Sequence, residues 1–188
     1  MEATGYCPAL VFWPQIGAIG GLMSATQTAN HIASRSERFK DLQKTLVLVK
    51  PDAVTRGLIG NIVNRFENRG LAIKGMKLIQ MDDKLAGNLY APHEGKPFYN
   101  DLVSYMTSGP IVCLCLEGVN AISIVRTMMG ATNPVEAAPG TIRGDFAQRL
   151  DCNCVHGSDS PESASRELPI FFGEGEILDY DPCHTHSL

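Results

Sequence analysis

The feature that most restricts the fold of this sequence is the order of strand-like and helical patterns from Gln43 onward. Short apolar, β-branched runs alternate with stretches whose apolar residues recur at helical spacing. The patterns follow in the order strand, helix, strand, helical insert, strand, helix, strand. This order is typical of the split βαβ, ferredoxin-like arrangement. We therefore predict an α+β sandwich in which helices cover one face of a four-stranded antiparallel sheet.

The individual elements are predicted from local residue patterns. Thr45–Val49 is a continuous apolar and β-branched run, as in a buried strand, and Gly70 ends a helix centred on Ile62. The other predicted strands are residues 71–80, 111–116 and 153–156, and the other predicted helices are residues 83–90, 98–107, 120–129 and 160–168. Proline and glycine indicate a long loop between residues 130 and 150.

Length and charge bound the functional classes. The chain has 188 residues and a net charge of −4, which suits one domain with a tail. An acidic chain without a basic stripe is not typical of nucleic-acid or membrane-surface binders, so we predict neither partner. No apolar run approaches the roughly 20 residues of a membrane span. An anion site must therefore come from a few basic residues brought together locally.

The six cysteines are predicted to be free thiols. They occupy positions 7, 113, 115, 152, 154 and 183, largely in hydrophobic or strand-like runs of a chain that is not small. No C-x-x-C motif is present, so neither a redox dithiol nor a zinc ribbon is indicated.

Residues 1–42 differ in composition from the rest of the chain. Pro14 and several glycines interrupt an apolar stretch that ends at Met23, and the basic residues come only late. This pattern matches neither a signal peptide nor an arginine-rich leader. We interpret residues 1–42 as a poorly ordered extension before a domain of residues 43–188, with a targeting segment or an internal start at Met23 as alternatives. The expected location is cytoplasmic, or an organelle if the extension is a targeting segment.

Common phosphate and metal motifs are missing, since the sequence has no Walker-type loop, no G-x-G-x-x-G after a strand and no H-E-x-x-H. His156 stands between a predicted strand and a helix, and its neutral ring could act as a nucleophile. Glu167, in the following helix, could hold the other ring nitrogen. From position alone, a structural histidine at a strand edge is the favoured alternative.

Three basic residues stand at the edges of predicted elements, namely Lys50, Arg126 and Arg143. Each alone reads as a solvated charge, but together they could clamp a polyphosphate. Thr132 and Asn153 could add neutral hydrogen bonds. Phe98 could stack on a base or belong to the core. Local patterns therefore indicate no more than a candidate anion site.

Six sequence blocks together resemble the nucleoside diphosphate kinase family, in the family's order and with similar spacing. The resemblance covers residues 43–181. The blocks are Leu48-Val-Lys-Pro-Asp-Ala-Val54, Lys96-Pro-Phe98, Ser108-Gly-Pro110, Thr132-Asn-Pro134, Pro139-Gly-Thr-Ile-Arg-Gly-Asp-Phe146 and Asn153-Cys-Val-His-Gly-Ser-Asp-Ser160. The resemblance implies a kinase that moves a γ-phosphate, mainly from ATP, between nucleoside triphosphates and diphosphates by a ping-pong mechanism.

The resemblance also implies roles for individual residues. His156 would carry the phosphate on Nδ1, with Glu167 and Ser158 orienting the ring. Lys50 and Asn153 would contact the sugar hydroxyls, with Lys50 also near the transferred group. The remaining roles are β-phosphate contacts by Arg126 and Thr132, γ-phosphoryl contacts by Arg143 and Tyr90, and base stacking on Phe98. A catalytically silent nucleotide-binding or scaffold protein on the same fold is the alternative.

The resemblance implies Mg²⁺ as the cofactor, carried by the nucleotide phosphates rather than by a protein cage, with Asp159 a candidate for a contact through water. It also implies a homo-oligomer. The loop around Pro134 is retained, which favours a hexamer over a tetramer, although the C-terminus is unlike the family's usual tail. Two departures flank Asn153: Cys154 should pack as a small hydrophobe, and Cys152 is predicted to make the site sensitive to oxidation.

Overall fold

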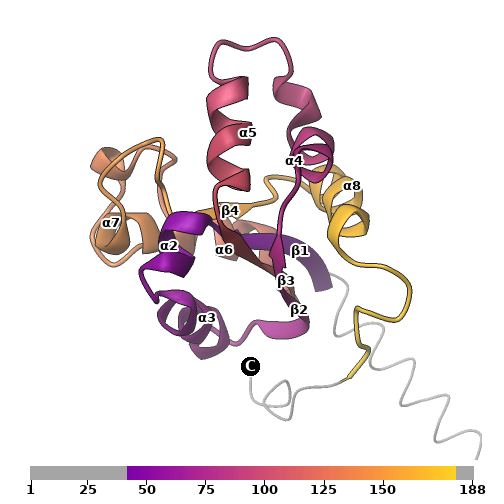
Figure 1. Cartoon of the computed structure of the whole chain (residues 1–188). Coiled ribbons are helices and arrows are strands. Elements are labelled where there is room, and N and C mark those ends of the chain that lie inside the picture. The colour runs from indigo at the N-terminus through magenta and orange to yellow at the C-terminus, as the bar shows by residue number, and fades with distance from the viewer. Residues whose placement is uncertain (1–41, 181–188) are drawn as a thin grey trace, which may run out of the picture. The chain divides into compact units, whose positions relative to one another are not determined.

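The computed structural model describes residues 42–180, which contain one four-stranded sheet in the order β2-β3-β1-β4 (Figure 1). The strands are β1 (Leu42–Val49), β2 (Ala72–Gln80), β3 (Pro110–Val119) and β4 (Val155–Gly157). All neighbouring strands are antiparallel. Each βαβ unit is therefore split by a strand of the other, which confirms the predicted α+β, ferredoxin-like fold.

The predicted helices are present, and two short ones were missed. The helices are α2 (Pro51–Thr55), α3 (Ile59–Asn68), α4 (Asp83–Tyr90), α5 (Tyr99–Thr107), α6 (Ala121–Met129), α7 (Ile142–Phe146) and α8 (Pro161–Phe171), with 3₁₀ turns η1 (Ala91–His93) and η2 (Pro134–Glu136). Both missed helices, α2 and α7, have five residues, too few to show a helical period. Local signals start them: Pro51 at the first position of α2 and a Thr141 hydroxyl that caps α7.

The prediction that helices cover one face of the sheet is wrong, because both faces are covered. Val47 and Val49 of β1 pack in a core with α3 and α6. Leu46 and Leu48 point the other way and pack with α4, α5 and α8. A strand whose successive residues are all apolar needs cover on both sides, since alternate side chains point to opposite faces. Figure 1 shows α4 and α5 projecting from the sheet as an antiparallel pair.

The structure tests some of the predictions on cysteines and chain ends, and others lie outside the residues it describes. Four of the cysteines are free thiols, as predicted, namely Cys113, Cys115, Cys152 and Cys154. Cys7 and Cys183 lie outside the described residues. The predicted extension also lies outside them, apart from its last residue, Leu42, which begins β1. Among residues 42–180, no helix is long and apolar enough to cross a membrane.

Candidate active site

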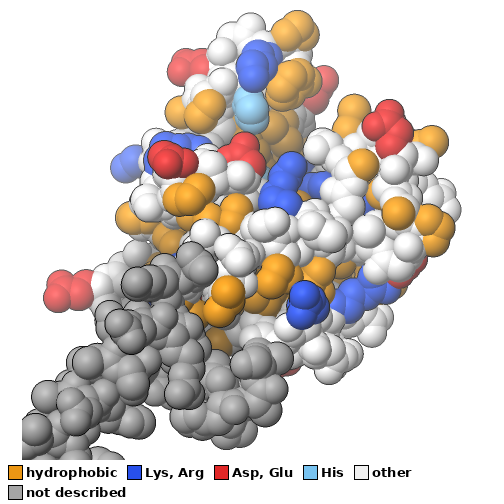
Figure 2. All heavy atoms as spheres, turned by 180° about the vertical axis from the view of Figure 1, so that it is seen from behind, with side chains coloured by type: hydrophobic (Ala, Val, Ile, Leu, Met, Phe, Trp, Pro, Cys, Tyr) orange, Lys and Arg blue, Asp and Glu red, His pale blue; other side chains and the backbone are white. Residues whose placement is uncertain are grey.

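A cavity of about 860 Å³ lies between the α4–α5 pair and the loop that carries α7. Figure 2 shows basic side chains gathered in the hollow beside the projecting pair. All the predicted site residues except Ser158 line this cavity, namely Lys50, Tyr90, Phe98, Arg126, Thr132, Arg143, Asn153, His156, Asp159 and Glu167. Residues far apart in the sequence therefore meet where β1 and β4 border the cavity.

His156 is held by one of its two ring nitrogens. It is the middle residue of β4, paired with Leu48 of β1. Its Nε2 lies 3.0 Å from Oε2 of Glu167, and the Ser158 hydroxyl donates to the same oxygen at 2.8 Å. Arg166 donates to the other carboxylate oxygen at 2.9 Å. The carboxylate thus fixes the ring and leaves Nδ1 as the nitrogen with a free lone pair.

The protonation states of this pair follow from burial and hydrogen bonding. Burial lowers the pKa of His156 below its usual value, whereas the bond to Glu167 acts in the opposite direction. Burial alone would raise the pKa of Glu167, but bonds from His156 and Ser158 hold it below its usual value. Near pH 7 the site therefore contains a neutral imidazole beside a carboxylate, which is the arrangement that a nitrogen nucleophile needs.

Tyr90, at the end of α4, forms the wall next to the imidazole. Its ring meets that of His156 edge-on, with 6.0 Å between the centroids. Its buried hydroxyl has no hydrogen-bond partner within residues 42–180. Burial, with a smaller effect of Glu167, raises the pKa of this phenol, so it remains a donor. Since buried hydroxyls are nearly always bonded, this unpaired donor is unusual among the residues that line the cavity.

Lys50 follows directly on the buried strand β1, and its ammonium group donates to Oδ1 of Asn153 at 2.7 Å. Burial, and then the charge of Arg143, lowers the pKa of Lys50 to about 8. The side chain is therefore a cation at neutral pH whose charge is costly to bury without an anion. A phosphate group would supply that anion.

Arg143, in α7, is held by backbone carbonyl groups. Its guanidinium donates to the carbonyl oxygens of Gly130 and Val155, both at 2.9 Å, and more weakly to that of Asn153 at 3.3 Å. The next residue must be glycine, because a Cβ at Gly144 would lie 2.2 Å from the carbonyl oxygen of Ala138. Burial and the charge of Arg126 lower the pKa of Arg143 to about 10, so it stays charged at neutral pH.

The remaining predicted residues surround this centre. Arg126 is half-buried in the last turn of α6, and Thr132 is exposed, with its carbonyl accepting from Nδ2 of Asn153 at 3.0 Å. Phe98, just before α5, is 50% exposed although it is large and apolar. Exposure of this ring excludes the core role that local patterns had left open.

Sequence reasoning missed other residues of the cavity wall, among them His93, Leu150 and Arg166. The His93 ring stacks on Tyr90 and tilts against Phe98, with centroids 6.2 and 5.7 Å apart. Leu150 is 60% exposed. A large apolar residue within a polar loop was the available signal for Leu150. No local pattern distinguishes Arg166 from an ordinary surface arginine of a helix.

Comparisons with known proteins agree with this geometry. The family model "Nucleoside diphosphate kinase" matches residues 43–177. A nucleoside diphosphate kinase of Roseiflexus castenholzii is 54% identical over 138 residues, covering 73% of this chain and 93% of that protein. One from Archaeoglobus fulgidus is 52% identical over 140 residues, covering 74% and 93%.

Solved structures agree as well. A Halobacterium salinarum nucleoside diphosphate kinase in complex with CDP is 46% identical, with a TM-score of 0.75, and the match covers 77% of this chain and 96% of that one. A transition-state mimic of the Borrelia burgdorferi enzyme with vanadate and ADP is 38% identical, with a TM-score of 0.74 over 78% and 96% of the two chains. Fold, site and sequence together show that this chain belongs to the nucleoside diphosphate kinase family.

Proposed function

We propose that the protein transfers the γ-phosphate of a nucleoside triphosphate, mainly ATP, to a nucleoside diphosphate through a phosphorylated His156. The observation that carries this proposal is the contact of Glu167 with Nε2, which leaves Nδ1 free in a cavity that Lys50, Arg126 and Arg143 also line. The CDP complex and the vanadate–ADP complex of the two solved relatives support nucleotides as substrates.

In the first half-reaction, the Nδ1 lone pair attacks the γ-phosphorus. The bond between this phosphorus and the β–γ bridging oxygen breaks, and the diphosphate leaves with the electron pair. In the second half-reaction, a terminal oxygen of another diphosphate attacks the phosphohistidine, and the neutral ring is restored. Such transfers depend on in-line positioning and on neutralised oxygen charge.

Each residue is assigned to a part of the nucleotide. Arg126 and Thr132 bind the β-phosphate, while Arg143 and Tyr90 bind the phosphoryl group in transfer. Lys50 and Asn153 contact the sugar hydroxyls, and Lys50 also lies by the transferred group. Ser158 acts through Glu167, to which it donates at 2.8 Å.

Mg²⁺ fits this site as a companion of the nucleotide. Among residues 42–180, no group of three or more His, Cys, Asp or Glu side chains could hold a metal. The exposed carboxylate of Asp159 lines the cavity and would contact the ion through water. When bound, the ion supplies neutralisation of the phosphate oxygens.

A half-reaction tests the proposal. Purified protein is incubated with γ-labelled ATP and Mg²⁺ without an acceptor, and GDP is added afterwards. We expect acid-labile, base-stable label on the protein that moves into GTP. A folded protein that takes no label would favour the alternative, a catalytically silent nucleotide-binding or scaffold protein.

The oligomeric state also remains a prediction: we expect a homohexamer rather than a tetramer. Light scattering after gel filtration tests it.

The rate of transfer should fall as pH rises through about 8, the pKa of Lys50. The charged form lies below this value, so its attraction for phosphate is present there and is lost above it. The measurement is kcat/KM against pH on both sides of this value. Lys50→Arg is the matched variant: its guanidinium keeps its charge, so the alkaline fall should move to higher pH. A wild-type profile that stays flat through this range would contradict the role of Lys50.

Replacing Phe98 should weaken binding of every nucleotide alike. In Phe98→Ala we expect KM to rise about tenfold, because stacking on an aromatic ring contributes about 1–3 kcal/mol per base. The rise should be similar for ATP and GTP, since every base has a π-face, and kcat should change little. Phe98→Tyr keeps the ring and should behave like the wild type. A rise confined to one base would instead indicate hydrogen-bond recognition at this position.

A further inference from the structure

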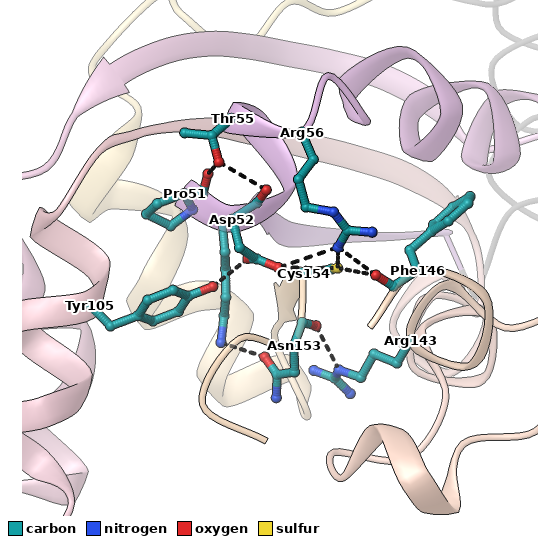
Figure 3. Close-up of polar contacts among 10 residues, drawn as sticks. Pro51, Asp52, Thr55, Arg56, Tyr105, Arg143, Phe146, Asn153 and Cys154 are labelled. Atoms are coloured by element: carbon teal, nitrogen blue, oxygen red, sulfur yellow. Dashed lines mark hydrogen bonds and ion pairs between the residues drawn. The ribbon is translucent and has the colours of Figure 1, made fainter. Parts of the chain in front are cut away.

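The carboxylate of Asp52 joins three separate segments just outside the cavity (Figure 3). Asp52 lies in the first turn of α2, and its side chain is 13% exposed. Its Oδ1 accepts a hydrogen bond from the hydroxyl of Tyr105 in α5. Its Oδ2 accepts from Sγ of Cys154 at 3.3 Å and lies 4.0 Å from Nη1 of Arg56. One side chain thus connects α2, α5 and the segment before β4.

The segment that Cys154 belongs to has an unusual backbone. Cys154 has φ +63°, a value that residues other than glycine seldom adopt. The N–H of Val155 donates to the carbonyl of Asn153 at 2.7 Å, two residues back, as in a γ-turn with positive φ, which is rare and strained. Such a turn persists only where surrounding contacts hold it. Sγ of Cys154 supplies such contacts: it lies 3.3 Å from Oδ2 of Asp52 and 3.4 Å from the carbonyl oxygen of Phe146, so its single proton has two acceptors within reach.

This turn places two groups of the active site. The N–H of Lys50 donates to the carbonyl of Cys154 at 2.8 Å, and Nζ of Lys50 donates to Oδ1 of Asn153 at 2.7 Å. Lys50 therefore contacts two adjacent residues of the turn, one through its backbone and one through its side chain. Lys50 and Asn153 line the cavity and Asp52 does not, so its carboxylate acts from behind these groups.

We propose that Asp52 is a positioning residue for phosphoryl transfer: through Cys154 and Tyr105 it holds the Asn153–Val155 turn and α5 in the geometry that aligns Lys50 and Asn153. This inference rests on the proposed function, because those two residues must act on the nucleotide. The Cys154 thiol suits the arrangement. Burial and the Asp52 charge raise its pKa to about 12, so it remains a proton donor to the carboxylate.

Asp52 also acts through its charge. Its carboxylate raises the pKa of Lys50, against the larger opposing effect of burial and the charge of Arg143. Removing the negative charge should therefore make Lys50 lose its proton at lower pH. The charged and titratable groups around Lys50 are Asp52 on α2, Tyr105 on α5, Arg143 on α7, His156 on β4, and the thiols of Cys152 and Cys154.

Three variants separate geometry from charge. Asp52→Asn removes the charge and one of the two acceptor oxygens, so Tyr105 and Cys154 can no longer both donate to this side chain. We expect kcat/KM to fall about ten- to a hundredfold, mainly in kcat, with the alkaline fall of the pH profile moved to lower pH. Cys154→Ala keeps the charge and loses the thiol bond, so the rate should fall less and the alkaline fall should stay in place. Asp83→Asn, an exposed carboxylate of α4, is the matched control and should change neither quantity.

The outcomes are distinguishable when the same preparations are tested for label uptake from γ-labelled ATP. A wild type that takes no label refutes the proposed function itself. An active wild type alongside an Asp52→Asn variant with unchanged kcat and pH profile overturns the positioning role, even if the variant unfolds at lower temperature. If Asp52→Asn does not fold, Cys154→Ala and Tyr105→Phe decide, because both keep the carboxylate; unchanged kcat/KM in both would overturn the proposal.

Discussion

His156→Gln should take up no label from γ-labelled ATP and should lose on the order of 10⁵-fold in kcat. The amide side chain offers no nucleophilic nitrogen, so the covalent intermediate cannot form. The variant should still fold and bind ADP, because His156 is only partly buried and the residues that we propose to bind phosphate are others of the cavity wall. Rapid-quench kinetics and calorimetric titration with ADP measure the two effects.

The matched variant is His93→Gln, which changes another histidine of the same cavity wall. It should still become labelled, which places the phosphate at His156 and not merely on a histidine. Label on the His156→Gln protein, or none on His93→Gln, would contradict the assignment. If the protein were instead a scaffold, its partner binding should be the same in His156→Gln as in the wild type.

Arg143→Lys should reduce both stability and transfer, although the charge is kept. The three guanidinium nitrogens bond to the backbone carbonyls of residues 130, 153 and 155, and one ammonium group cannot reach all of them. Leaving buried carbonyls unpaired should lower the free energy of unfolding by about 2 kcal/mol. Loss of the rigid fork beside the transferred phosphoryl should lower kcat/KM about a hundredfold or more.

Chemical denaturation and steady-state kinetics test these two losses separately. Arg69→Lys, at the exposed end of α3, is the matched change and should leave both quantities as they are. If Arg143→Lys kept the rate of the wild type while losing stability, Arg143 would be a structural residue only. If it kept both, the hydrogen bonds of its guanidinium would be energetically irrelevant.

The fold was predictable where the residue pattern is distinctive. The β-branched, apolar composition of Thr45–Val49 indicates a buried strand, and the apolar spacing from Leu58 to Phe66 indicates a helix. The short helix α7 was not predictable, because its five residues depend on a Thr141 cap and on close packing at Gly144. The helices on the second face were missed because the apolar run of β1 was interpreted only as a buried strand. Its alternate side chains point to opposite faces of the sheet, and both sets must be covered.

The site was predictable from motif resemblance and only weakly from chemistry. His156 alone resembles any histidine at a strand edge, and nothing local shows that Glu167 returns to Nε2. The contacts that orient the site residues were harder to predict from the sequence. Cys154 was expected to pack as a small hydrophobe; it is buried, but it also donates to Asp52. The predicted oxidation at Cys152 remains untested, and burial raises the pKa of that thiol, which disfavours the reactive thiolate.

The position of β1 has a consequence for how the chain is made. This strand is synthesised before both of its partners, since Val47 pairs with Leu114 and with Gly157. At the pace of a ribosome, residue 157 follows residue 47 by about ten seconds. Throughout that time the strand lacks its neighbour β4, and for much of it the strand also lacks β3 and the helix α6. The nascent chain therefore exposes an apolar strand before all of its partners exist, so the yield of folded protein should depend on chaperones more than the stability of the folded domain would suggest.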